Sequence, residues 1–271
     1  MLGGNPTLNT FGGDEPARWD QIQTGEIPPP EKVMTLQGTI IASGALLAIC
    51  IGAALIAWLK IVEPAVSVDG KTLNYGALMP WLFGSMIGGL VLSLVCIFAK
   101  KTCMFLGPLY AAAEGIFIAT VSAVIVHRFM GEQNMGLIFQ AVTLTFGIFG
   151  GLLIAYGSGL IRTSPIINKV FMVGMGGIML YVAALWIGNG IFGLGIPNLY
   201  SSASPLGIGF SLFVVAMASY SLVIDFETIK QGVAQRAPKH YEWFAAVGLL
   251  ISLVWLYIEV LRLVAKLRSS E

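Results

Sequence analysis

Two apolar stretches near the C-terminal end of the chain decide its fold: GFSLFVVAMASYSLVIDFETI (209–229) and WFAAVGLLISLVWLYIEVLRL (243–263). Each is long enough to cross the hydrocarbon core of a bilayer, about 30 Å thick, as a helix of about 20 residues. The first stretch nevertheless contains Asp225, and the second contains Glu259 and Arg262. Ionisable residues are costly inside lipid, so these three are candidates for a functional site and need a polar interior or a partner.

The composition of the whole chain indicates a membrane protein. Of its 271 residues, 56% are hydrophobic and 11% are charged, whereas about a quarter of the residues in a soluble domain are charged. The formal net charge of +1 and the lack of a clustered basic stripe exclude nucleic acid as a partner. The three cysteines have no CxxC spacing, so we interpret them as small core residues.

The sequence predicts an all-α integral membrane protein with seven transmembrane helices, because seven apolar runs are long enough to span a bilayer. The expected spans are about 38–59, 77–99, 104–126, 136–158, 168–190, 206–229 and 241–267. Together they form a domain over residues 38–268. Residues 1–37 are polar and contain Gly and Pro, so we expect a flexible segment there and no cleaved signal peptide.

The basic residues predict the orientation of the bundle. Nine of the 15 lysines and arginines fall on the side of the N-terminus, and three of the other six belong to the last helix and its tail. Segments rich in Lys and Arg stay on the cytoplasmic side. We therefore expect a multi-pass protein of the cell (inner) membrane, with its N-terminus inside and its C-terminus outside.

The helical rise of about 1.5 Å per residue gives each polar residue an expected depth. Asp225 lies about 6–8 Å from the inner boundary, and Glu114 and Ser252 lie about 14 Å and 15 Å from it. Glu259 lies about 25 Å from that boundary, so it is too distant to share a proton or an ion with Asp225. Asp225, Glu114 and Ser252 are therefore the candidates for one ion- or proton-sensing site. The alternative for Glu114 is a protonated acid that hydrogen-bonds a neighbouring helix.

One face of the last helix carries a stripe with a spacing of three and four residues. Its members are Ala245, Gly248, Ser252, Trp255, Glu259, Arg262 and Lys266. Such a stripe suits a central helix. Glu259 and Arg262 form a secondary polar stripe or, alternatively, neutralise each other as i,i+3 neighbours near the interface. Asp225 is a proton sensor or, alternatively, a helix-end acid that reaches water or loop lysines.

Catalysis is not expected, although YGSGL (156–160) is similar to the Gly-Ser-Gly pattern of intramembrane serine proteases. A serine nucleophile at Ser158 would need a histidine at the same depth. His127 lies a membrane's width away, and His240 lies in a loop outside any helix core. Because phosphate-binding, dinucleotide and Cys/His metal motifs are also missing from the sequence, it predicts no enzyme and no cofactor.

The stretch LVIDFETIKQGVAQRAPKHYEWFAAVGLLISLVWLYIEVLRLV (222–264) resembles the last two helices of the Bax inhibitor-1-like (transmembrane Bax inhibitor motif) family, in its bacterial branch. YAAAEGIFIATVS (110–122) and the opening segments NPTL (5–8) and VMTLQGTI (33–40) also resemble that branch. The resemblance implies a seven-helix fold in which the last helix is surrounded by the other six. It also implies a pH-responsive calcium leak controlled by two aspartates, one in each of the last two helices.

Asp225 matches the first of these aspartates, with Glu227 where the family's Asp-x-Gln-x-Ile pattern has glutamine. Ser252 stands where the family has the second aspartate, and the second span contains no arginine to pair with Asp225. We therefore hypothesise that Glu114 supplies the second acid, with Ser252 as its polar neighbour. Asp225 is then also the residue expected to contact a calcium ion transiently.

Two functions remain open at this point. The first is a low-conductance cation leak, most simply for calcium, that is gated by protonation of Asp225. The second is a membrane regulator that transports nothing and binds another membrane protein, such as a membrane-bound protease, as some relatives are thought to do. The lipid bilayer is a partner in either case, and the sequence does not determine the oligomeric state.

Overall fold

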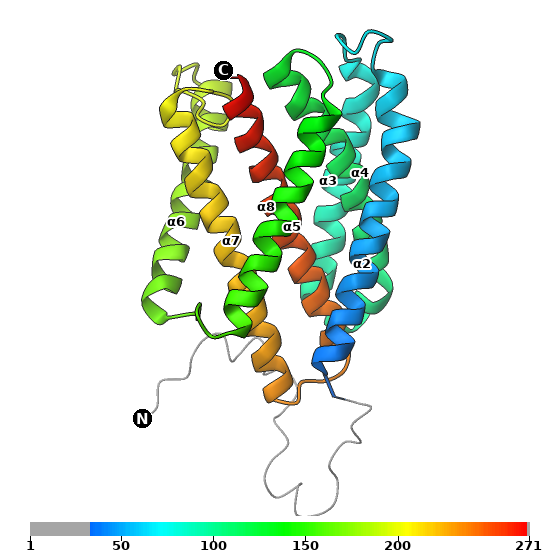
Figure 1. Cartoon of the computed structure of the whole chain (residues 1–271), viewed down its shortest axis with the longest axis vertical. Helices are drawn as coiled ribbons and strands as arrows, with labels where there is room; N and C mark the ends of the chain where they lie inside the picture. Colours follow the sequence, from blue (N-terminus) through cyan, green and yellow to red (C-terminus); the bar gives the residue numbers. More distant parts are fainter. Residues whose placement is uncertain (1–32, 270–271) are drawn as a thin grey trace, which may run out of the picture.

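The computed structural model describes residues 33–269, which form an all-α bundle (Figure 1). Its long helices are α2 (Leu36–Ala57), α3 (Tyr75–Phe98), α4 (Cys103–Met130), α5 (Met135–Gly157), α6 (Pro165–Ala184), α7 (Pro205–Ala234) and α8 (Tyr241–Ser269). Short 3-10 or π helices lie between some of them: η3 (Trp58–Val62) and η4 (Glu63–Ala65) after α2, η5 (Lys100–Thr102) before α4, and η6 (Leu185–Asn189) after α6. Within residues 33–269, seven helices are long and apolar enough to cross a membrane, which confirms the predicted fold class. The flexible segment expected before the first span lies mostly outside the described residues.

Polar residues at the membrane boundaries determine where most of these helices begin. Five N-cap side chains accept a hydrogen bond from the backbone N–H three residues on: Thr35, Asn74, Asn134, Ser164 and Ser204. Each cap satisfies an N–H group that would otherwise have no partner. The first helical residue of both α6 and α7 is proline, whose missing N–H costs nothing at this position.

Helix α8 is the most buried of the seven. Of the most apolar 18 residues of α8, 67% are buried inside the bundle, whereas the corresponding share in α6 is 11%. It packs against α2, α4, α5 and α7 and also touches α3. Helix α6 packs on α7 at the edge of the bundle (Figure 1) and reaches α8 through a cluster of apolar side chains around Trp255. The last helix is therefore central.

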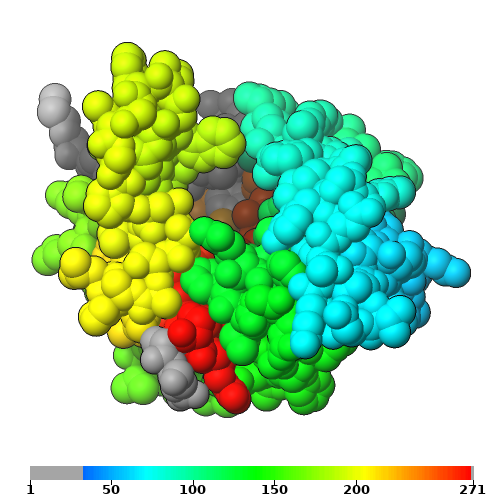
Figure 2. Space-filling view, turned by 90° about the horizontal axis from the view of Figure 1, so that it is seen from above, coloured from blue at the N-terminus to red at the C-terminus, as the bar shows by residue number. Residues whose placement is uncertain are grey.

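The ring of helices around α8 is open between α3 and α6, which do not contact each other. Figure 2 shows the end of the bundle where α6 joins α7. A hollow is visible there, with α3 on one side and the connection that follows α6 on the other. Ile251 of α8 is 40% exposed, although the next residue, Ser252, is only 8% exposed. One face of the central helix is therefore not covered by the chain.

The two ends of the bundle differ in their connections. We call the end that contains the connection between α7 and α8 the α7–α8 end, and the opposite end the α6–α7 end. At the α7–α8 end, the backbone N–H of Met34 donates to the carbonyl of Ala237 over 2.6 Å. The carboxylate of Glu242 accepts hydrogen bonds of 2.9 Å from both the backbone N–H and the hydroxyl of Thr35. The start of α2 is thus tied to the start of α8.

Candidate functional site

Asp225 and Ser252 lie opposite each other where α7 contacts α8. The Ser252 hydroxyl hydrogen-bonds the Asp225 carboxylate. The second carboxylate oxygen, Oδ2, is buried and has no hydrogen-bond partner among the described residues. A buried carboxylate with an unsatisfied oxygen is costly, and a proton or a cation would relieve that cost.

The surroundings of Asp225 provide few other hydrogen-bond partners for its carboxylate. Ser221 lies one helical turn earlier on α7, but its hydroxyl already donates to the carbonyl of Ala218 over 2.7 Å. Leu222 and Phe226 are buried in the largest apolar cluster of the molecule. The carboxylate is therefore held in a mainly apolar contact between two helices, with the hydroxyl of Ser252 as its polar neighbour.

Glu114 occupies a different contact, between α4 and its neighbours α2 and α3. The hydroxyl of Tyr110, one turn earlier on α4, hydrogen-bonds the carboxylate. Its Oε2 atom is buried without a hydrogen-bond partner among residues 33–269. A methyl group added at Gly89 of α3 would lie only 3.2 Å from Oε1, so the carboxylate sits directly against the α3 backbone. Glu114 is thus a second buried acid with one unsatisfied oxygen.

The structure therefore brings two of the three sensing candidates together. Asp225 and Ser252 are in contact, whereas Glu114 is held by Tyr110 in the apolar cluster that also contains Cys50. The two acids have different hydrogen-bond partners on different helices. Their assignment to one proton-sensing site remains a prediction.

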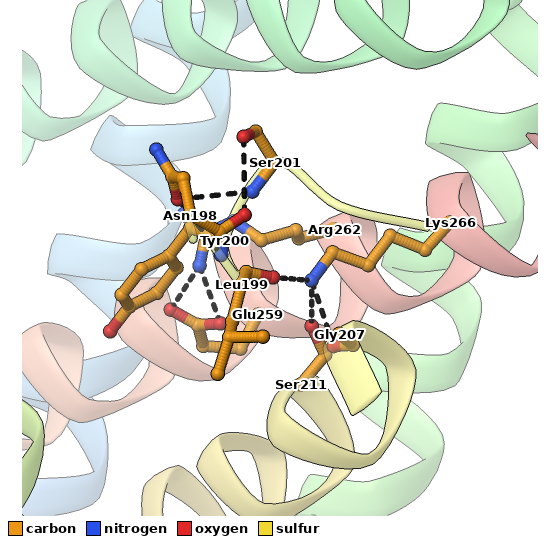
Figure 3. Close-up of polar contacts among 9 residues, drawn as sticks. All are labelled: Asn198, Leu199, Tyr200, Ser201, Gly207, Ser211, Glu259, Arg262 and Lys266. Atoms are coloured by element: carbon orange, nitrogen blue, oxygen red, sulfur yellow. Dashed lines mark hydrogen bonds and ion pairs between the residues drawn. The ribbon is translucent and has the colours of Figure 1, made fainter. Parts of the chain in front are cut away.

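Glu259 and Arg262 form an ion pair near the α6–α7 end. One guanidinium nitrogen, Nη1, donates to both carboxylate oxygens over 2.6 Å (Figure 3). Glu259 is 4% exposed. The guanidinium also lies over the ring of Tyr200, with 4.7 Å between its central carbon and the ring centroid. The local i,i+3 pairing that the sequence left as an alternative is therefore present.

Lys266 completes this polar group, and the sequence assigned it no partner. Its side chain is fully buried. The ammonium group donates to the carbonyl of Leu199 over 2.6 Å, to that of Gly207 over 2.9 Å and to the hydroxyl of Ser211 over 2.7 Å (Figure 3). All three donor positions of the lysine are thus used, and α8 is tied to α7 and to the connection before it.

Tyr200 belongs to that connection and lies outside the membrane-spanning helices. Its burial raises the pKa of the phenol to about 12. The carboxylate of Glu259 adds to this increase in pKa, and the guanidinium of Arg262 opposes it. The ring therefore stays neutral at physiological pH and provides an uncharged face for the arginine.

The candidate site residues do not form a group of side chains typical of a stable metal centre. Within residues 33–269, no three His, Cys, Asp or Glu side chains come close enough to hold a metal ion. Calcium takes about six to eight oxygen ligands, and the contact of Asp225 with Ser252 offers fewer.

The model of the protein family described as Bax inhibitor 1 like matches residues 5–269, which is nearly the whole chain. No curated protein matches the chain, and neither does any solved structure. The family match includes both helices of the contact at Asp225 and the polar group at the α6–α7 end.

Proposed function

The chain belongs to the Bax inhibitor 1 like family, and on that premise we propose that it is a pH-responsive cation leak pathway, with calcium as the permeant ion and protonation of Asp225 as the gate. The observation that carries this proposal is the buried, unpartnered Oδ2 atom of Asp225 at the contact between α7 and α8. No stabilising role is evident for that atom, and an acid within a membrane-spanning helix most often marks a pathway for ions or protons.

The two protonation states of Asp225 have different consequences for the pathway. The ionised carboxylate attracts a hard cation such as calcium. The protonated carboxyl has lost that attraction and can donate a hydrogen bond across the contact, where the hydroxyl of Ser252 is in reach. A change in charge at a helix–helix contact can favour one of two packings. The lack of contact between α3 and α6 supports a route along α8, because it leaves the bundle open on that side (Figure 2).

Calcium flux into proteoliposomes between pH 6 and pH 8 tests the proposal. For the unaltered protein we expect a flux that changes with pH. For Asp225→Asn we expect the same flux at every pH, equal to that of the unaltered protein at pH 6, because the amide resembles the protonated acid. The matched control is Glu227→Gln on the same helix. Glu227 accepts hydrogen bonds from the hydroxyl of Tyr156 over 2.7 Å and from Gln231 over 3.0 Å, so its replacement should leave the pH response intact.

A second function is favoured by one observation, the neutral serine opposite Asp225. With a single acid at this contact, the chain can instead be a membrane regulator that transports nothing and binds another membrane protein, such as a membrane-bound protease. The absence of calcium flux at every pH would contradict the leak and support the regulator. A flux that does not change with pH, in both the unaltered protein and Asp225→Asn, would contradict the gate.

A further inference from the structure

A groove opens on the outside of the bundle between α2 and α5, in the half nearer the α7–α8 end. Its volume is about 680 Å³, within the usual range for small-molecule sites of about 300–1,000 Å³. Helices α2 and α5 do not contact each other, so α7 and α8 form the floor of the groove. The lining is mainly apolar and includes Leu47, Phe149, Leu153, Leu249 and Leu253.

Two polar groups break this apolar lining. Lys230 lies at the end of the groove next to the α7–α8 connection, with its ammonium nitrogen 5.9 Å from the centroid of the Tyr156 ring. It is exposed. Ser43 lines the groove further along α2, and its hydroxyl oxygen is buried without a hydrogen-bond partner among the described residues. The groove thus has a cationic end and, deeper in, one unsatisfied hydroxyl.

The surface around the groove is positively charged, like Lys230. Across the described residues, the α7–α8 end carries seven lysines and arginines: Lys100, Lys101, Arg162, Lys169, Lys230, Arg236 and Lys239. Two acids lie near this surface among the described residues. Glu227 accepts hydrogen bonds from Tyr156 and Gln231 and also attracts Lys230, and Glu242 accepts hydrogen bonds from Thr35. Basic pockets between membrane helices at such an end attract anionic lipid head groups.

We propose that this groove binds one anionic phospholipid. An acyl chain lies between α2 and α5 against Leu249 and Leu253, the phosphate contacts Lys230, and the hydroxyl of Ser43 donates to an ester carbonyl of the lipid. The occupant comes from the bilayer because all four lining helices are long and apolar enough to span it. This site does not depend on the proposed cation pathway.

The position of the groove gives the lipid a structural effect. Phe226 and Leu253 line it, and each is the next residue after one member of the Asp225–Ser252 contact. A bound acyl chain therefore packs on the apolar side of that contact. It also fills the space between α2 and α5 and completes the cover of α8 on this side of the bundle.

Two glycines of α2 provide a matched pair of variants. A Cβ atom added at Gly44 or at Gly52 meets nothing within 4 Å, so both positions have open space in which to place a leucine. Gly44 lines the groove and Gly52 does not. We would titrate the purified full chain in detergent with palmitoyl-oleoyl phosphatidylglycerol or the corresponding phosphatidylcholine, and measure bound lipid by native mass spectrometry.

The unaltered protein should bind phosphatidylglycerol more tightly than phosphatidylcholine. Gly44→Leu should weaken binding of both lipids about tenfold, the loss of contact with about two methylene groups, whereas Gly52→Leu should bind as the unaltered protein does. Lys230→Gln should weaken phosphatidylglycerol about fivefold and leave phosphatidylcholine unchanged. Equal losses in the two leucine variants would overturn the groove as the site.

The lysine variant keeps the test decisive even if Gly44→Leu does not fold. Lys230 is exposed, so its replacement by glutamine should not disturb the bundle, and thermal melting in the same detergent checks this. Equal affinity of the unaltered protein for the two lipids, or an unchanged preference in Lys230→Gln, would overturn the assignment of an anionic head group to this lysine.

Discussion

Two polar contacts of α8, one at its C-terminal end and one near its middle, treat buried charges in opposite ways. At the α6–α7 end, Glu259 and Arg262 pair with each other, and Lys266 uses all its donors on the connection and on α7. Near the middle of α8, Asp225 has the hydroxyl of Ser252, and its Oδ2 atom has no partner among the described residues. A fully paired buried charge can be explained by structure alone. An acid left partly unpaired suggests a role other than stability.

The largest expected effect on stability is at Lys266. Lys266→Met should lower the free energy of unfolding by about 3 kcal/mol, because the buried acceptors at Leu199 and Ser211 lose a charged donor. Unfolding of the purified protein in mixed micelles measures this. Arg268→Met is the control, since Arg268 is exposed near the end of the same helix and should change the value by less than about 0.5 kcal/mol. Equal effects in both variants would contradict a stabilising role for the hydrogen bonds of Lys266.

Glu259→Gln should cost less, about 2 kcal/mol, because Arg262 loses its carboxylate but keeps the ring of Tyr200 and some contact with water. The double variant Glu259→Gln/Arg262→Gln should lose less than the sum of the two single variants, as expected for residues in direct contact. The same unfolding measurement applies. Additive losses would mean that the ion pair contributes nothing to closing this end of the bundle.

The sequence predicts most of the fold, because hydrophobic length and helical period are local properties. The stripe on the last helix correctly indicates a central helix, since residues three and four apart share a face. The short π turns after α2 and α6 have no comparable signal. The opening between α3 and α6 also escapes prediction, because it depends on how whole helices are placed and not on any one segment.

Some contacts of the polar groups can be predicted from the sequence, and others cannot. The pairing of Glu259 with Arg262 can be foreseen from their i,i+3 spacing. The partners of Lys266 cannot, because the carbonyl groups of Leu199 and Gly207 lie 67 and 59 residues away in sequence and any residue type could supply them. Depth arguments place Glu114 and Asp225 at similar levels in the membrane, but they do not say which neighbours each acid contacts. The contacts of Glu114 with Tyr110 and with the α3 backbone at Gly89 depend on the rotation of α4 about its own axis.

Ser252→Asp would place a second acid beside Asp225 and so test the contact between these two positions. Two adjacent carboxylates cannot both be ionised without strong repulsion. We expect this variant to be less stable at pH 8 than at pH 6 by about 1.4 kcal/mol relative to the unaltered protein, and its calcium flux to respond more strongly to pH. Ser252→Asn, which has a similar shape and no charge, is the control. An identical pH response in both variants would place Asp225 and Ser252 further apart than the structure does.

Asp225→Asn should have a smaller effect on stability than Lys266→Met or Glu259→Gln. Because one carboxylate oxygen has no partner, replacing the acid should lower the free energy of unfolding by less than about 0.5 kcal/mol or raise it slightly. Unfolding at pH 7, beside Glu259→Gln, provides the measurement. A loss as large as that of Glu259→Gln would make Asp225 a structural acid and remove the contrast between the two contacts.

The effect expected at Tyr200 is absent at physiological pH and shows only in alkali. A pKa of about 12, above the ordinary value of about 10, means that the folded protein holds the phenolic proton more tightly than the unfolded chain does. The resulting stabilisation is complete below about pH 10 and is lost as the pH rises from there through 12.

Tyr200→Phe keeps the ring under Arg262 but has no proton to lose. The unaltered protein should therefore lose stability relative to the variant between pH 9 and pH 11, by at most about 1 kcal/mol, because Tyr200 is only partly buried. Other ionisations cancel, since both proteins share them. If the two proteins lose stability in parallel, the phenol of Tyr200 is not held in a buried environment that raises its pKa, and only its ring contributes to closing the α6–α7 end.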